Sequence, residues 1–177
     1  TLISLLGWVF VAGGWSNVRS AEPVTKAVLT TDQKAAIQSE LEHWNGLVGE
    51  WRGVGQVTRN STKDSWQENG AWVWDIKKDR VAIRYDVTEG KHISTALLTY
   101  DPAKKLYLLT ATLPDKTQRL YTGTRTGTKL VLESPANKAG IVHQISITAL
   151  NDKRTLVLYQ TRTAEQEVYT RLAEVGY

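Results

Sequence analysis

Hydrophobic residues recur with two different periods along the chain, and each period predicts a different kind of element. Ile37, Leu41 and Trp44 are spaced at i, i+4 and i+7, which places them on one face of a helix. A capping-box pattern precedes this stripe, and residues that favour a left-handed helix end follow it: Thr30 with Gln33, and Asn45 with Gly46. The sequence therefore predicts one helix over 31–44.

From Trp51 onward the period changes to two. Val81, Ile83, Tyr85 and Val87, for example, alternate with less apolar neighbours, as in a strand with one buried face. Turn-forming residues interrupt the alternation at nine places and leave ten predicted strands: 51–59, 66–76, 80–88, 92–100, 106–113, 118–123, 128–134, 141–149, 155–163 and 167–175.

Short turns make strands that are consecutive in the sequence neighbours in the sheet. An open meander of ten strands would leave two long edges exposed, and closure into a barrel removes both. We therefore expect an all-β fold, namely a closed up-and-down antiparallel barrel of about ten strands preceded by one helix. A barrel of this size is wide enough to hold a small ligand.

The beginning of the chain has a different character. Residues from Leu2 to Gly14 carry no charge, and a polar stretch ending in small residues follows. This order is typical of a secretory leader, which we place at 1–21, with a retained membrane anchor as the alternative. Residues 22–45 form the linker and the capping helix, and 46–177 form the barrel. A leader implies an exported protein, periplasmic or extracellular.

Composition and charge remove several functional classes. The chain has 177 residues, a formal net charge of +4 and no cysteine, which excludes disulfides and thiolate chemistry. Lysine and arginine are dispersed rather than gathered in a stripe, so we expect no nucleic-acid partner. No metal-ligand spacing or nucleophile motif is present, and we expect neither a metal site nor catalytic residues, hence no enzyme. The sequence does not indicate an oligomeric state.

The segment from Leu47 to Gly55 carries the most informative motif. Gly49 lets the chain turn into the first strand, Trp51 plugs one end of the barrel, and Gly53 leaves space on the same face. This Gly-x-Trp-x-Gly-x-Gly pattern resembles lipocalin-like (calycin) barrels, most closely secreted bacterial lipocalin-like domains and ten-stranded nitrobindin-type barrels. The resemblance implies that a basic residue of the last strand, here Arg171, covers Trp51 through a cation–π contact.

Five residues are candidates for lining a lumen. Trp72 and Trp74 share a strand face, Ile83 and Tyr85 follow on the next strand, and His143 lies among isoleucines. Of the other histidines, His92 is expected to be exposed at a strand start. Trp66 shares a face with Glu68, and we expect it to be either exposed or at the barrel mouth. Nitrobindin-type barrels bind haem through a histidine close to the C-terminus, where this chain has none, so His143 would be a relocated ligand.

Three functions remain. The first is a non-enzymatic exported protein that holds a small apolar or aromatic ligand in the barrel lumen, without a cofactor. The second is a structural or accessory subunit of a membrane-associated assembly, anchored by an uncleaved N-terminal segment and holding no ligand. The third is nitrobindin-like haem binding. A membrane partner is expected only where the N-terminal segment is retained.

Overall fold

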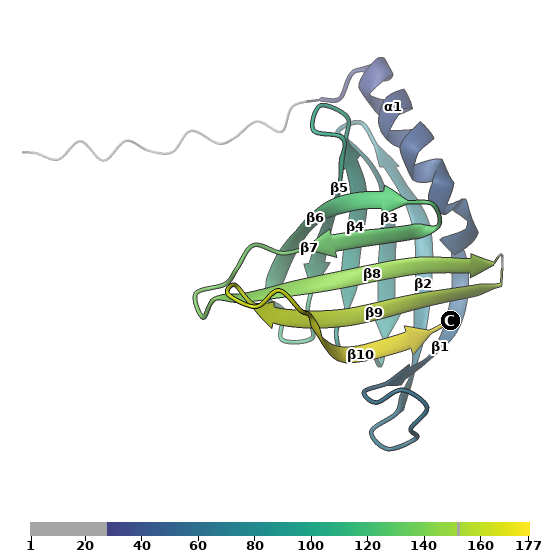
Figure 1. Cartoon of the computed structure of the whole chain (residues 1–177). Coiled ribbons are helices and arrows are strands. Elements are labelled where there is room, and N and C mark those ends of the chain that lie inside the picture. Colours follow the sequence, from purple (N-terminus) through teal and green to yellow (C-terminus); the bar gives the residue numbers. More distant parts are fainter. Residues whose placement is uncertain (1–27, 152) are drawn as a thin grey trace, which may run out of the picture.

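A closed barrel of ten antiparallel strands forms most of the molecule (Figure 1). The computed structural model describes residues 28–151 and 153–177, so the predicted leader at 1–21 lies outside the described residues. The all-β fold and the single N-terminal helical region are confirmed. In chain order the elements are α1 (Thr31–Leu41), η1 (Glu42–Leu47), β1 (Gly49–Gln56), β2 (Trp66–Lys77), β3 (Arg80–Thr88), β4 (Thr95–Asp101), β5 (Leu106–Thr112), β6 (Gln118–Thr126), β7 (Lys129–Glu133), β8 (Ile141–Asn151), β9 (Arg154–Thr163) and β10 (Thr170–Gly176).

Each strand pairs with the strands before and after it in the chain, and β1 pairs with β10 to close the barrel. The closing seam is short, with Val54 opposite Gly176, Gly55 opposite Val175 and Gln56 opposite Glu174. On its other side β1 pairs with β2 over a longer stretch, from Gly49 to Gly55. The up-and-down order follows from the short turns that the sequence contains.

The predicted capping box is present at the start of α1. The Gln33 amide donates to the Thr30 hydroxyl at 3.2 Å, and the Thr30 amide donates to the Gln33 side chain at 2.9 Å. The predicted end of the helix was wrong, because α1 stops at Leu41 and the chain continues as the 3₁₀ helix η1. This tighter winding keeps a helical direction through Gly46, which therefore makes no left-handed cap.

Several strand boundaries also differ from the prediction, by up to three residues. β6, for example, continues to Thr126 instead of residue 123. β1 begins at Gly49, whose φ of 142° suits glycine, rather than at Trp51. β4 begins at Thr95 instead of residue 92, and β10 begins at Thr170 instead of residue 167. The residues released from these two strands lie in connections at one end of the barrel, where side chains are freer to fold inward.

The two ends of the barrel are built differently. We call the end that contains η1 the closed end. The Trp74 indole, near the end of β2, donates to Asn45 of η1 at 3.1 Å, which places η1 at the same end as the β2–β3 hairpin. Alternation of strand direction places the β2–β3, β4–β5, β6–β7 and β8–β9 hairpins at this end. The opposite end, which we call the mouth, carries the other five connections. No helix among the described residues is long and apolar enough to cross a membrane.

Candidate functional site

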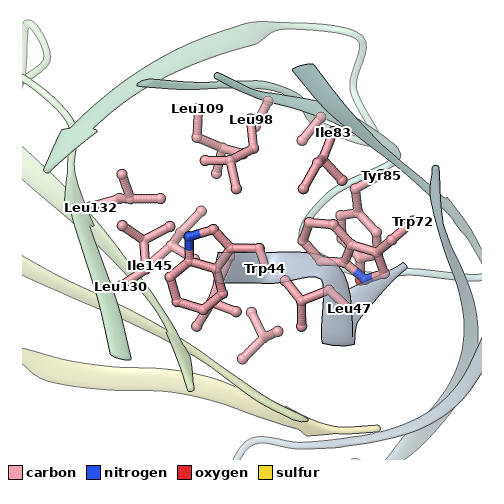
Figure 2. Close-up of a cluster of buried hydrophobic side chains, with 14 of the residues drawn as sticks. Trp44, Leu47, Trp72, Ile83, Tyr85, Leu98, Leu109, Leu130, Leu132 and Ile145 are labelled. Atoms are coloured by element: carbon pink, nitrogen blue, oxygen red, sulfur yellow. The ribbon is translucent and has the colours of Figure 1, made fainter. Parts of the chain in front are cut away.

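The half of the barrel near the closed end is filled with apolar side chains. Trp44 and Leu47 of η1 point into the barrel and meet residues from several strands (Figure 2). Ile83 and Leu98 are fully buried in this cluster. Two turns of helix thus act as a plug, which explains why the 3₁₀ segment follows α1 before the first strand begins.

Four of the predicted lumen residues belong to this packed region or border it. The Trp72 and Tyr85 rings stack at a centroid distance of 3.9 Å, and both residues are 2 % exposed. Ile83 is buried beside them, and Trp74 packs against the cluster at its outer end. These side chains therefore face inward as expected, but they pack against protein instead of lining the cavity described next.

A cavity of about 300 Å³ lies at the mouth. This volume is at the lower end of the range for small-molecule sites. His143 lines the cavity and is the one predicted ligand residue that does so. The other lining residues come from β6, β8, β9, β10 and two mouth connections: Lys91, His92, Leu113, Pro114, Asp115, Arg119, Tyr121, Gln144, Tyr159, Gln160 and Leu172.

Aromatic rings form one wall of the cavity. The His92 imidazole stacks on the Tyr159 ring at 4.5 Å and contacts the Trp66 ring at 5.7 Å. The Lys91 ammonium group lies 4.7 Å from the centre of the Trp66 ring on a cation–π contact. His92 was predicted to be exposed, and this was wrong, because the connection before β4 folds inward and packs its imidazole between two rings.

The cavity combines neutral imidazoles with cationic groups. Burial, together with Lys91, lowers the pKa of His92 below its usual value, and burial with Arg119 does the same for His143. Both rings are therefore neutral at pH 7, each with one donor and one acceptor nitrogen. Arg119 donates to the Tyr121 hydroxyl at 3.3 Å. Cationic groups thus stand beside neutral hydrogen-bonding groups on the lining.

Asp115 is the one acidic residue among the side chains that line the cavity. Its carboxylate accepts hydrogen bonds from the Thr117 amide at 2.9 Å and the Thr117 hydroxyl at 2.6 Å. These bonds lower the pKa of Asp115, so it is ionised at neutral pH. Lys91 and Arg119 carry two positive charges against the one negative charge of Asp115, so the lining has a net positive charge.

A buried carboxylate lies deeper in the barrel. Glu68 is 3 % exposed, and it accepts a hydrogen bond from the Trp66 indole at 2.6 Å and another from the Tyr177 hydroxyl. The Tyr177 and Tyr85 hydroxyls are also hydrogen-bonded to each other. Burial is the main reason that the pKa values of Tyr85, Tyr159 and Tyr177 are raised, so these phenols stay protonated.

A second cavity lies outside the barrel wall, beside α1. It has a volume of about 490 Å³ and a largely apolar lining that includes Ile37, Val81 and Leu97. No imidazole or hydrogen-bonded carboxylate–phenol group lines it. The mouth cavity is the better candidate site, because its polar groups converge inside the barrel.

The residues of the glycine–tryptophan motif lie where β1 leaves the closed end. The Trp51 indole donates to the Leu47 carbonyl at 2.7 Å, which ties the first strand to η1. A Cβ at Gly53 would lie 2.5 Å from the Tyr177 ring, and one at Gly55 would lie 2.2 Å from Trp66. The two glycines therefore make room for the rings that surround Glu68.

The expected contact between Arg171 and Trp51 is not formed. Arg171 lies at the mouth, where its guanidinium group is 3.3 Å from the Glu174 carboxylate. The cation–π contacts found in the described part of the chain are Lys91 with Trp66 and Arg162 with Tyr169. Because β10 starts at the mouth and Trp51 is beside η1, the two side chains belong to opposite ends of the barrel.

Comparison with family models and with curated proteins assigns this chain to no family. No family model matches the chain, and no curated protein is similar to it. Among the residues that the structure describes, no group of three or more histidine, cysteine, aspartate or glutamate side chains is placed to hold a metal ion.

Proposed function

We propose that the protein is an exported, non-enzymatic binding protein whose mouth cavity holds a small aromatic molecule with an acidic group. The observation that carries this proposal is the combination, in one cavity, of the stacked His92 and Tyr159 rings with the cationic Lys91 and Arg119. Stacked rings favour an aromatic ligand, and cationic side chains favour a carboxylate or a similar anion.

The charges also predict how such a ligand is oriented. Lys91 and Arg119 belong to the connections and strand start at the mouth, whereas the Glu68 carboxylate is buried deeper in the barrel. An anionic group of the ligand is attracted to Lys91 and Arg119 and repelled by the Glu68 carboxylate. The acidic end of the ligand therefore faces the mouth, and its ring points inward against Tyr159.

Calorimetric titration with three matched probes tests the proposal. Phenylacetate carries both features, phenylacetamide lacks the charge, and cyclohexylacetate lacks the aromatic ring. We expect phenylacetate to bind tightest, and Arg119→Gln to weaken its binding about tenfold or more while changing phenylacetamide binding little. Arg84→Gln is the matched control, because Arg84 lies on the outer face and pairs with Asp86 at 2.7 Å.

Equal affinity for all three probes would contradict the assignment of the lining. Failure of every probe to bind would favour the accessory-subunit function, in which the barrel holds no ligand. Export is tested separately by the intact mass of the protein recovered from cells, which should correspond to a chain that begins near residue 22.

Haem binding is a second candidate, supported by the presence of two neutral imidazoles, His92 and His143, in the same cavity. His143 would be the iron ligand, and the iron would supply a centre for gas binding or electron transfer. Reconstitution with haem should then give a Soret band that His143→Ala abolishes and His43→Ala retains, since His43 lies on η1 and is exposed. A band unchanged in His143→Ala excludes this ligand.

A further inference from the structure

The connections at the two ends of the barrel carry different charges. At the closed end, residues 77–80 have a formal net charge of +2, and 101–105, 126–129 and 151–154 have +1 each, which gives +5. These closed-end ranges include the strand residues that flank each turn. Counted in the same way, the five mouth connections, 56–66, 88–95, 112–118, 133–141 and 163–170, have a net charge of −1. Every hairpin at the closed end contains at least one lysine.

The basic side chains at the closed end point into solvent. Lys78, Lys105, Lys129 and Lys153 are all exposed, and each comes from a different hairpin. Residues that are distant in the sequence are thus brought to one end by the up-and-down order of the strands, which Figure 1 shows. This is why the sequence, with no basic stretch longer than two residues, gave no indication of a basic surface.

Exposed apolar side chains lie among these lysines. Ile76 is 54 % exposed directly before Lys77, and Leu150 is 50 % exposed at the end of β8. Val28, at the start of the described chain, is 71 % exposed. Its neighbour Leu29 lines the α1 cavity together with Asp79 and Pro102, which places this segment beside the β2–β3 and β4–β5 hairpins.

Acidic groups at this end reduce the positive charge without reversing it. Glu40 lies 3.6 Å from Arg125, which is outside the counted ranges. Asp75 lies 2.6 Å from Arg80 and 3.5 Å from Lys77, so it offsets one of the positive charges counted for 77–80. Glu42, on η1, accepts a hydrogen bond from Gln38. Glu50 is exposed near the start of β1. The four hairpin tips remain basic around these groups.

We propose that the closed end of the barrel docks on a bilayer that contains anionic lipids. Basic side chains near such a surface are attracted to its negative potential, and exposed apolar side chains among them enter the interface. The apolar residues favour a bilayer over a nucleic acid, whose phosphates would be met by basic and polar groups alone. The start of the described chain lies at this same end, so a retained N-terminal anchor would hold the barrel in the same orientation.

Vesicle co-sedimentation of the full chain tests this proposal. The probes are phosphatidylcholine vesicles with and without 30 % phosphatidylglycerol, and the measured quantity is the ratio of the two affinities. Any contribution of the apolar segment from Leu2 to Gly14, where it is retained, applies to both vesicle types, and the ratio removes this contribution. We expect the ratio to be large at low salt and to fall as salt screens the charges.

Two triple variants locate the surface. The first variant removes one charge from each of three closed-end hairpins by Lys78→Gln, Lys105→Gln and Lys129→Gln. Each substitution should reduce the affinity for anionic vesicles about fivefold, and the three together should reduce it about a hundredfold. The control replaces three exposed mouth lysines by glutamine: Lys63, Lys116 and Lys138. We expect the control to bind as the unaltered protein does. Circular dichroism confirms that both variants keep the strand content.

Three results would overturn the proposal. The first is equal binding of anionic and neutral vesicles by the unaltered protein, and the second is an equal loss in the two triple variants. The third is tighter binding of a DNA duplex than of anionic vesicles at the same salt concentration, with a loss in the closed-end variant, which would assign the surface to a nucleic acid instead.

Discussion

Tyr177→Phe is expected to destabilise the barrel strongly, although it removes a single oxygen atom. The Tyr177 hydroxyl donates to the buried Glu68 carboxylate and is also hydrogen-bonded to the Tyr85 hydroxyl. Because its one proton goes to Glu68, Tyr177 must accept the proton of Tyr85. The substitution therefore removes a bond to a charged group and leaves the buried Tyr85 hydroxyl without an acceptor.

The expected cost follows from these two losses. A hydrogen bond to a charged group contributes about 1.5–3 kcal/mol, and a buried hydroxyl left without a partner costs about 1–3 kcal/mol. Allowing for relaxation, the free energy of unfolding should fall by about 3 kcal/mol, which lowers Tm by about 6–12 °C for a chain of this size. Tyr85→Phe is the matched control, because it breaks one neutral hydrogen bond, leaves Glu68 with both donors, and should cost about 1 kcal/mol.

Urea denaturation followed by tryptophan fluorescence measures both variants, and an unchanged m value shows that the unfolding reaction is the same. The double variant Glu68→Leu/Tyr177→Phe replaces both partners by apolar groups. It should lose at least about 1 kcal/mol less than the sum of the two single variants, since neither partner remains unpaired. A cost for Tyr177→Phe within about 0.5 kcal/mol of that for Tyr85→Phe would refute the role assigned to Glu68.

Two further predictions concern pH and backbone packing. His92 and His143 have pKa values below the usual 6.5, so the unfolded chain binds protons more readily than the folded one. The Tm should therefore fall as the pH is lowered through 6.5. A variant with both histidines replaced by glutamine should show a flatter decline, and an unaltered decline would contradict the lowered pKa values. Gly123→Ala places a Cβ 1.8 Å from the Val131 carbonyl oxygen and should separate β6 from β7. In urea denaturation it should lower the free energy of unfolding by more than about 3 kcal/mol. Gly46→Ala is the control, because a Cβ there has no atom within 4 Å, and it should change the free energy of unfolding by less than about 0.5 kcal/mol.

The barrel could be predicted from the sequence because its determinants are local. Alternation along each strand decides which side chains face inward, and the turn residues decide that neighbouring strands pair. The closing pair β1 and β10 needed only the argument that a sheet of ten strands avoids free edges. The start of β4 was misplaced because the connection before it folds inward at His92, and tertiary packing rather than periodicity decides the conformation of that connection.

The candidate site was less predictable because its parts come from distant positions. Glu68 lies on the same strand face as Trp66 and Trp72, so an inward direction could have been inferred, but its burial depends on a donor 109 positions later. Arg119 and Tyr159 carried no motif that marked them. His143 could be selected because a polar residue among isoleucines is conspicuous. Trp72 and Tyr85 were expected to line the lumen because they lie on apolar strand faces, and their stacking shows that they fill the barrel.

The alternation of strand direction also separates the two proposed surfaces. Odd and even connections fall at opposite ends, so basic hairpins meet at the closed end while imidazoles and phenols meet at the mouth. A bilayer at the closed end therefore leaves the mouth open to solvent. The apolar plug of Trp44 and Leu47 separates the mouth cavity from the hairpins of the closed end. Consequently, the closed-end lysine variant should bind phenylacetate with unchanged affinity. The Arg119→Gln variant should bind anionic vesicles as the unaltered protein does. A change in either affinity would show that the two surfaces are coupled through the barrel.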